Sequence, residues 1–239
     1  MPIPKHIAQN IIVTLDFDGC IAIGDKTKVR CAKLYHNIDI HPNQITKGTY
    51  PLGPAKYKEL MAKVTIEHIN EYELDPQCKE VLNYLFVQGF RFAVVTSRSG
   101  PELEAAKAFS KYHKLPIKYF HATNNNPKDI ICKKLCSRAM IDDTFSKLVE
   151  LLDTPLTLFF LKRIWNENEL FNASNNIVSI SSWNEFAQRL IELRELHEAV
   201  CYYNNWKNNF GSVKQISQFI IENPQLAHDY LRKYNKMVA

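Results

Sequence analysis

The chain has 239 residues, of which 46% are hydrophobic, and it carries a formal net charge of +5 at pH 7. This length and composition exclude an intrinsically disordered chain, and they suffice for one domain with an insert or for two small domains. The lysines and arginines are scattered and form no basic block, so a small phosphorylated substrate is expected and nucleic acid is not an expected partner.

Cysteine spacing and the lack of long apolar segments predict the surroundings of the protein. No CxxC pair occurs, which favours a reducing compartment, and no apolar run approaches the roughly 18 residues that span a bilayer. We therefore expect a soluble, cytoplasmic protein without a membrane partner; export without a cleavable signal and the oligomeric state stay open. The cysteines are Cys20, Cys31, Cys78, Cys132, Cys136 and Cys201.

The first predicted element is a buried strand over residues 10–17, because its apolar residues form a nearly continuous block. Residues 21–75 then read as a small helical insert, with apolar side chains at spacings of three and four and a Pro/Gly-rich loop, "HPNQITKGTYPLGP". A helix follows, for which the sequence predicts an N-cap at Asp75, Pro76 in the first turn and a stop at Gly89.

The remaining core alternates strands and helices. Strands separated by helices of about ten to fifteen residues predict right-handed βαβ units, and hence an α/β, Rossmann-like parallel sheet flanked by helices. We expect this core to span residues 1–20 and 76–192, with a helical C-terminal extension over 193–239. The expected strands are "FRFAVVTSR", "IKYFHA", "RAMIDDT", "LTLFFL" and "NIVSI".

Polar clusters follow three of these strands and should open onto one crevice, since ligands of such sheets bind at the carboxyl ends of the strands. Four carboxylates meeting there would repel one another unless a cation neutralised them. Hard oxygen ligands suit Mg²⁺, which would also let a carboxylate attack phosphorus. The clusters are Asp16 with Asp18, then Thr96, Ser97 and Arg98, then Asp142 with Asp143.

These motifs resemble those of the haloacid dehalogenase superfamily of phosphohydrolases. "DFDG" at residues 16–19 resembles its first motif, "VVTSR" at 94–98 its second, and "IDDT" at 141–144 its fourth. Lys128 resembles the third, because it lies 14 residues before Asp142, a separation usual for this superfamily. Any one motif alone has an ordinary structural explanation, such as a turn or a helix cap. Their joint order favours catalysis.

The resemblance implies a role for each matching residue. Asp16 would attack phosphorus to form an aspartyl-phosphate, and Asp18 would act as acid and then as base. Thr96 and Lys128 would hold the phosphoryl oxygens. Mg²⁺ would bind the Asp16 carboxylate, the Asp18 carbonyl and Asp142, while Asp143 would ligate through water or orient Lys128. Gly19, Ser97 and Arg98 complete the expected substrate site.

Three further expectations concern substrate and packing. The insert should act as a lid that contacts the leaving group. Its polar and aromatic residues could read a base or sugar, although ordinary surface and packing roles are the favoured interpretation. Cys20, where the superfamily usually has threonine or valine, is expected to pack in the core. The insert residues are Tyr35, His36, Lys47, Tyr50, Lys56 and Tyr57.

The segment "FFLKRIWNENEL" and the later "SSWNEF" resemble nucleotidase-like members, including relatives of 5'(3')-deoxyribonucleotidases. Trp165 and Asn166 should then lie on a loop near the crevice, and Trp183 should begin a helix and pack on the core. We predict a Mg²⁺-dependent phosphatase of small monoesters such as nucleotides. The alternatives are a phosphatase of protein or nucleic-acid ends that docks through the C-terminal arm, and a non-catalytic binding module.

Overall fold

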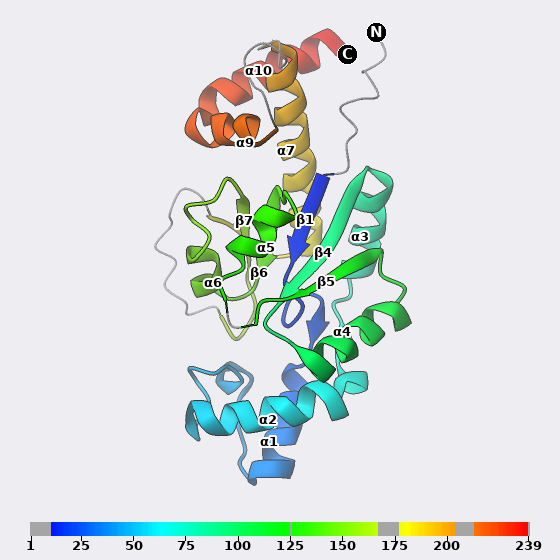
Figure 1. The fold of residues 1–239 in the computed structure, drawn as a ribbon, viewed down its shortest axis with the longest axis vertical. Coiled ribbons are helices and arrows are strands. Elements are labelled where there is room, and N and C mark those ends of the chain that lie inside the picture. Colours follow the sequence, from blue (N-terminus) through cyan, green and yellow to red (C-terminus); the bar gives the residue numbers. More distant parts are fainter. Residues whose placement is uncertain (1–10, 125, 167–176, 204–212, 239) are drawn as a thin grey trace.

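A six-stranded sheet lies at the centre of the computed structural model, which describes residues 11–124, 126–166, 177–203 and 213–238. All neighbouring strands in it are parallel, in the order β5-β4-β1-β6-β7-β8 (Figure 1). The predicted parallel α/β sheet is confirmed. The strands are β1 Ile11–Leu15, β4 Phe90–Thr96, β5 Ile117–Ala122, β6 Ala139–Asp142, β7 Thr157–Leu161 and β8 Ile177–Ile180.

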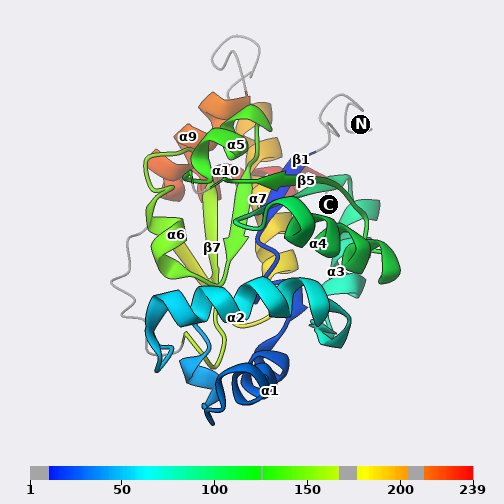
Figure 2. The same ribbon diagram turned by 60° about the horizontal axis from the view of Figure 1, so that its bottom comes forward.

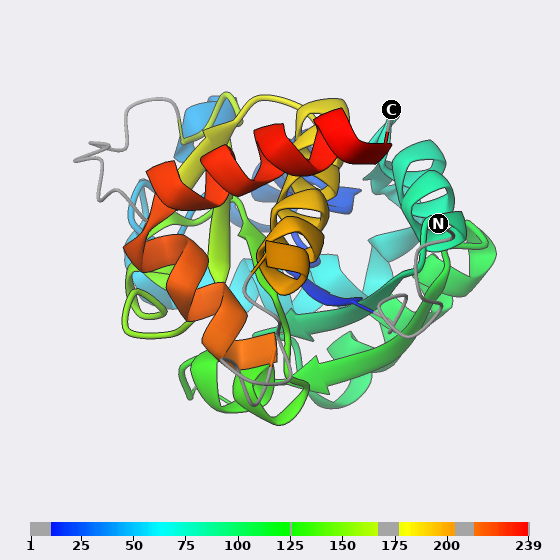
Figure 3. The same ribbon diagram turned by 90° about the horizontal axis from the view of Figure 1, so that it is seen from above.

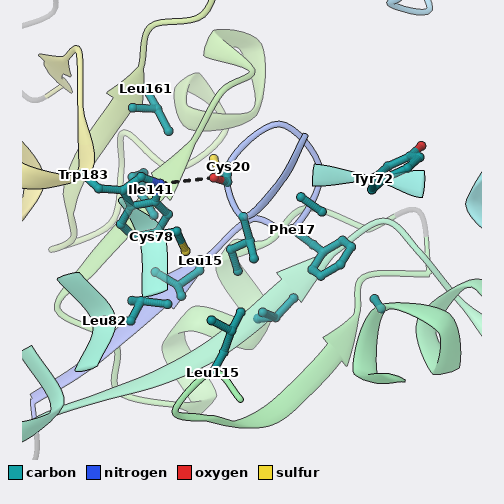
Figure 4. Packing of buried hydrophobic residues seen from close by; sticks show 14 of the residues in the cluster. Leu15, Phe17, Cys20, Tyr72, Cys78, Leu82, Leu115, Ile141, Leu161 and Trp183 are labelled. Carbon is teal, nitrogen blue, oxygen red and sulfur yellow. Dashed lines mark hydrogen bonds between the residues drawn. The ribbon is translucent and has the colours of Figure 1, made fainter. Parts of the chain in front are cut away.

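Side chains of the central strands are buried on both faces of the sheet. Ile141 packs in one core cluster with side chains of α3 and α7, whereas its neighbour Met140 packs in another with side chains of α5 and α6. Successive side chains of a strand point to opposite faces, so covering both faces requires the continuous apolar runs seen in the sequence. Figure 4 shows part of the first cluster, including Leu82 of α3 and Trp183 of α7. The flanking helices are α3 Cys78–Val87, α4 Gly100–Tyr112, α5 Asp129–Lys134, α6 Phe145–Val149 and α7 Trp183–Tyr203.

The start of α3 differs from the prediction. The helix begins at Cys78, and Asp75 is not its N-cap. Instead, the Asp75 carboxylate accepts a hydrogen bond from the Gln77 amide in a preceding turn and pairs with Arg163 across the fold. The expected stop at Gly89 is confirmed, since its φ of +94° is a conformation that glycine adopts without strain.

Between β1 and α3 the chain leaves the core through a short antiparallel pair, β2 and β3. The helices between these two strands lie together beyond the carboxyl ends of the sheet (Figures 1 and 2). This places the segment over the end of the sheet where the polar clusters were expected. Its elements are β2 Ala22–Ile23, α1 Asp25–His36, η1 Pro42–Gln44, α2 Gly53–Glu67, η2 Ile69–Glu71 and β3 Glu73–Leu74.

The C-terminal helices lie at the opposite, amino end of the strands (Figures 1 and 3). Helix α7 passes unbroken through residue 193, where the extension was expected to begin. Its second half packs with α9 (Val213–Glu222) and α10 (Pro224–Val238) around a separate apolar cluster. Helix α10 begins at Pro224, and proline is common in the first turn of a helix. From the sequence, the aromatic residues of this extension are expected to pack on the core, but they lie outside the described side chains; they are Tyr202, Tyr203, Trp206 and Phe210. The cluster consists of Leu196, Ala199, Val200, Ile216, Ile220, Ala227 and Leu231.

Two sequence-level properties of the described residues agree with the structure. The five cysteines whose side chains it describes are free thiols. Among the described residues, no helix combines the length and the apolar character needed to cross a membrane.

Candidate active site

The polar ends of three strands meet because β1 lies between β4 and β6 in the sheet. Asp16 directly follows β1, and its amide donates to the carbonyl oxygen of Ile141 in β6. Thr96 ends β4 and Asp142 ends β6. The polar groups that the sequence predicted to meet therefore lie together at the carboxyl edge of the sheet.

Lys128 joins two of the carboxylates. Its ammonium donates to Asp16 Oδ1 at 2.5 Å and to Asp142 Oδ2 at 2.7 Å, although the side chain is almost wholly buried. The other oxygen of Asp142 accepts the amide of Thr144 at 2.9 Å. Lys128 thus pairs with Asp142 and not with Asp143, the residue expected to orient it. Lys128, which the sequence indicates by its spacing to Asp142, therefore lies beside Asp16, the expected nucleophile.

Burial and mutual repulsion act on the remaining charges. Burial, together with repulsion from Asp142 and Asp143, raises the pKa of Asp16 well above its usual value despite the attraction of Lys128. Burial and Asp142 likewise raise the pKa of Asp143 to about 7, against the hydrogen bond from Trp165. Burial and repulsion therefore disfavour the ionised forms of Asp16 and Asp143 in the absence of a further cation.

The donor set fits a divalent cation. Ligand atoms of Asp16, Cys20 and Asp143 all lie within 4.8 Å of one another. The carboxylate oxygens of Asp16 and Asp143 are ligands that Mg²⁺ prefers, whereas the soft, neutral Cys20 thiol is not. A bound cation would lower the energy of the ionised forms that burial disfavours. Both oxygens of Asp142 accept short hydrogen bonds. Asp143 accepts one short hydrogen bond, from Trp165, and one of 3.5 Å from the Thr144 hydroxyl, so its Oδ1 is the freer oxygen.

Arg98 holds Asp18, which sequence reasoning did not anticipate. Its Nε and Nη2 donate to the two Asp18 oxygens at 2.8 Å each, and its Nη1 donates to the carbonyl oxygens of Thr65 and Glu102. Burial alone would raise the pKa of Asp18, but the attraction of Arg98 prevails and lowers it. Arg98, expected to bind substrate, instead ties the loop after β1 to α2 and α4.

The other expected phosphate-binding residues lie at the end of β4. Thr96 is buried, and its hydroxyl accepts the amide of Arg98 at 3.2 Å, which fixes the turn after the strand. Ser97, the residue between them, is exposed. The turn therefore presents Ser97 outward while Arg98 points back to Asp18.

Gly19 allows Asp143 to approach the loop after β1. A Cβ atom on Gly19 would lie 2.0 Å from Asp143 Oδ2, and the backbone φ of +78° also favours glycine. The same Oδ2 accepts a hydrogen bond from Trp165 Nε1 at 2.7 Å, and Asn166 Nδ2 donates to the Asp143 carbonyl oxygen at 2.7 Å. The expected position of Trp165 and Asn166 near the crevice is confirmed.

Arg163 is a positioning residue that the sequence did not reveal. It donates to the carbonyl oxygens of Gly19 and Cys20 at 2.8 and 3.2 Å, and to Asp75 at 2.7 Å. Its signal in the sequence was weak, because a single arginine after a strand is usually a surface residue. Arg163 therefore binds the loop of the first motif to the start of α3.

Cys20 is fully buried, as its packing role requires. Burial and the nearby acids raise the pKa of its thiol well above the usual value, so the thiol stays neutral and unreactive. Trp183 begins α7, packs in the core and donates to the Cys20 carbonyl oxygen at 3.2 Å (Figure 4). The expectations for both residues are confirmed.

The insert residues proposed as base or sugar readers divide into two groups. Tyr35 and His36 are engaged within the insert, with His68 and Tyr50 as their hydrogen-bond partners, each at 2.7 Å. Tyr57 instead lies close enough to Asp18 and Asp143 for their charges to act on its hydroxyl, and burial is the main cause of its raised pKa. The remaining two are Lys47, which is exposed, and Lys56, which pairs with Glu59.

Comparison with known proteins identifies the fold. The chain matches no sequence model of a protein family and no curated protein sequence. Among solved structures, it resembles a predicted phosphatase from Clostridium acetobutylicum, with a TM-score of 0.58 and 15% identity over 77% of this chain and 99% of that one. A putative haloacid dehalogenase-like hydrolase from Bacteroides fragilis gives a TM-score of 0.57 and 12% identity, over 74% and 100% of the two chains.

A third similar structure is a haloacid dehalogenase family hydrolase from Deinococcus radiodurans, described with bound phosphate and sodium. It gives a TM-score of 0.54 and 13% identity, over 77% of this chain and 96% of that one. At such identities the likeness establishes the fold, which agrees with the order of the four motifs. The resemblance to the haloacid dehalogenase superfamily is therefore confirmed at the level of the fold.

Proposed function

We propose, from the haloacid dehalogenase-like fold of this chain and from the chemistry of its crevice, that the protein is a Mg²⁺-dependent phosphohydrolase of small phosphate monoesters. One observation carries the proposal: Lys128 is shared between Asp16 and Asp142 at the carboxyl edge of the sheet, with Asp143 and Asp18 beside them. Buried acids in such number are costly unless they hold a cation. A carboxylate next to a cation can attack a phosphoryl group, because the positive charge offsets the repulsion between anions.

Asp16 is the proposed nucleophile. Its carboxylate lies at the end of a buried strand, where the backbone hydrogen bond to Ile141 fixes it. In the proposed reaction, Asp16 attacks phosphorus and the bond to the leaving oxygen breaks, which gives an aspartyl-phosphate that water then hydrolyses. Lys128 holds one Asp16 oxygen, leaving the other for the attack.

A magnesium ion held by Asp16, the Asp18 carbonyl, Asp142 and Asp143 would supply charge neutralisation at the phosphoryl oxygens. The Lys128 ammonium would donate hydrogen bonds to the same phosphoryl oxygens. Thr96 and Ser97 line the turn on the opposite side of Asp16, where a hydroxyl or a backbone amide would meet the phosphoryl group.

Asp18 is the proposed acid and base. Its pairing with Arg98 favours the ionised form, which suits the base that activates water in the second half-reaction. For the first half-reaction, Asp18 must gain a proton, so we propose that substrate binding loosens the Arg98 pair. Arg98 also contacts the Thr65 carbonyl in α2, so movement of the insert would act on this pair directly.

The substrate is proposed to be small because the insert lies over the carboxyl ends of the strands, where the acids meet (Figure 2). A nucleotide is the candidate suggested by the segment around Trp165, which resembles nucleotidase-like proteins. Docking of a macromolecule through the C-terminal helices has less support, since these helices lie at the far end of the strands (Figure 1).

The test is a hydrolysis screen of nucleotides, sugar phosphates, an aryl phosphate and phosphopeptides, with Mg²⁺ and with EDTA, and of 2-haloacids for dehalogenation. We expect Mg²⁺-dependent phosphate release that Asp16→Asn lowers on the order of a thousandfold or more, since an amide is a poor nucleophile. Asp39→Asn is the matched control, because Asp39 is exposed on the insert and forms a surface ion pair with Lys33. Phosphate release that survives in Asp16→Asn, or dehalogenation alone, would refute the proposal.

A further inference from the structure

Lys28, in the first turns of α1, is a cation at the crevice that no described residue pairs with. Its side chain is half-buried, and among the described residues it makes no hydrogen bond or ion pair within 4.0 Å. Although burial opposes it, the charges of its surroundings, those of Asp18 and Asp143 included, raise the pKa of its ammonium. The other cations described at the site already have carboxylate partners; they are Arg98, Lys128 and Arg163. Among the described residues of the site, Lys28 is therefore the cation left for a ligand.

Tyr72 supplies a second group without a partner. It is 4% exposed, and its hydroxyl is buried with no hydrogen-bond partner. Gly24 makes room for the ring, because a Cβ atom there would lie 2.3 Å from Tyr72 Cζ. A buried hydroxyl left unpaired costs free energy, which a ligand oxygen would recover.

These groups converge from separate elements. Lys28 comes from α1, Tyr57 from α2 and Tyr72 from the end of η2. Each of the three acts electrostatically on another member of the group and on Asp18. Contacts place Tyr72 beside the proposed acid and base: the Arg98 guanidinium that holds Asp18 lies 5.8 Å from the centroid of the Tyr72 ring. Gly24, whose carbonyl oxygen accepts the Lys28 amide, lies against the same ring. The leaving group of the substrate would lie on this side of Asp18.

Neutralising the carboxylates does not by itself account for this arrangement. Arg98 already compensates Asp18 with two hydrogen bonds, whereas Lys28 makes none to the described residues. A lysine that served only to balance Asp18 or Asp143 would gain most from a direct ion pair. The absence of such a pair among the described residues leaves the Lys28 ammonium available to an anion.

We infer that Lys28, Tyr57 and Tyr72 form a subsite for a second anionic group, a carboxylate or another phosphate, on the leaving group of a small phosphate monoester. This inference rests on the proposed function and narrows it. A nucleoside monophosphate carries no second anionic group. The subsite therefore favours phosphorylated acids and bisphosphates as substrates over the nucleotide suggested by the segment around Trp165.

The test compares substrates that differ only in the second group: 2-phosphoglycolate and ethanediol bisphosphate against ethyl phosphate. Lys28→Met should lower kcat/KM for one of the anionic substrates on the order of tenfold or more beyond its loss for ethyl phosphate, since a charged hydrogen bond is lost. Which of the two shows the loss identifies the anion. Lys26→Met is the matched control, because Lys26 lies on the same helix as Lys28, is exposed, and pairs with Glu73 of β3. This control should leave the ratios of kcat/KM between the substrates unchanged.

Tyr72→Phe gives a second, independent measurement. Removing an unpaired buried hydroxyl should leave the thermal stability of the free protein unchanged or higher, while lowering the preference for the anionic substrate several-fold. Preference ratios that stay at the wild-type value in both Lys28→Met and Tyr72→Phe would overturn the subsite.

A binding measurement separates failure of this inference from failure of the proposed function. Calorimetry with the Asp16→Asn protein and Mg²⁺ should show tighter binding of the anionic compound than of ethyl phosphate, and Lys28→Met should remove the difference. If wild-type protein hydrolyses no substrate but this difference is found, the phosphatase proposal fails and the anion subsite stands. If no difference in binding is found, the subsite is refuted whatever the turnover.

Discussion

The ion pair between Arg98 and Asp18 offers the most direct test of how the site is held together. Arg98 is 3% exposed, yet it donates to both Asp18 oxygens and to the carbonyl oxygens of Thr65 and Glu102. Replacing it by methionine keeps an unbranched apolar stem over the ring of Phe17 but removes the charge. Asp18 would then be left as an ionised group without its partner.

The expected magnitude follows from these contacts. Removing one partner of a buried ion pair costs about 3 to 5 kcal/mol. The Asp18 side chain is 27% exposed, so water would solvate part of its charge and the lower value, about 3 kcal/mol, applies. Each lost hydrogen bond to a carbonyl oxygen adds about 1 kcal/mol or less. We expect the free energy of unfolding to fall by about 3 to 5 kcal/mol.

Urea unfolding followed by tryptophan fluorescence measures this change. In the double variant Arg98→Met with Asp18→Asn, no unpaired charge remains, so it should be more stable than the sum of the two single changes predicts by about 1 to 3 kcal/mol. Arg91→Met is the matched control, because Arg91 donates to two carbonyl oxygens near the surface and pairs with no carboxylate of the described residues. Strict additivity of the two single changes would refute the reasoning.

Two further predictions concern stability. Gly19→Ala should destabilise the protein by about 1 to 3 kcal/mol in urea unfolding, because Asp143 lies close to Gly19 and the φ of Gly19 is positive. The control Gly48→Ala, with open space around it, should change the stability little. Equal effects of the two substitutions would contradict the steric argument. Burial and Arg138 lower the pKa of His197 to about 3. As the pH falls below about 6.5, His197 becomes protonated in the unfolded chain but stays neutral in the folded protein. The free energy of unfolding should therefore fall by up to about 1.4 kcal/mol for each pH unit of acidification. His197→Gln should reduce this slope between pH 6.5 and 4.5, while an unchanged slope would show that His197 does not contribute; His36→Gln, on the insert, is the control.

The sequence by itself determined the elements that depend on neighbours along the chain. Continuous apolar runs are sufficient to indicate strands buried on both faces, and the alternation with helices implies their parallel pairing. The acids at 16, 18, 142 and 143 could be placed at one edge because parallel strands end on the same side of a sheet. Lys128 could be added only through its spacing to Asp142, which the superfamily resemblance made meaningful.

The start of α3 shows that a local sequence pattern can fail to predict a helix cap. Asp75 followed by proline has the form of a helix cap, but the carboxylate gains more from Arg163, which lies 88 residues away in the sequence. Competition of this kind between a local and a distant partner cannot be recognised from the periodicity of the sequence.

The tertiary structure alone decided which charges pair. Arg98 and Asp18 are 80 residues apart, and Lys128 and Asp16 are 112 apart; nothing in the local sequence favours these partners over others. The same holds for Lys28 and Tyr72, whose side chains find no hydrogen-bond partner among the described residues. A charge in the interior is stabilised by the few groups within a few ångströms of it, and the fold, rather than the order of residues, brings those groups together.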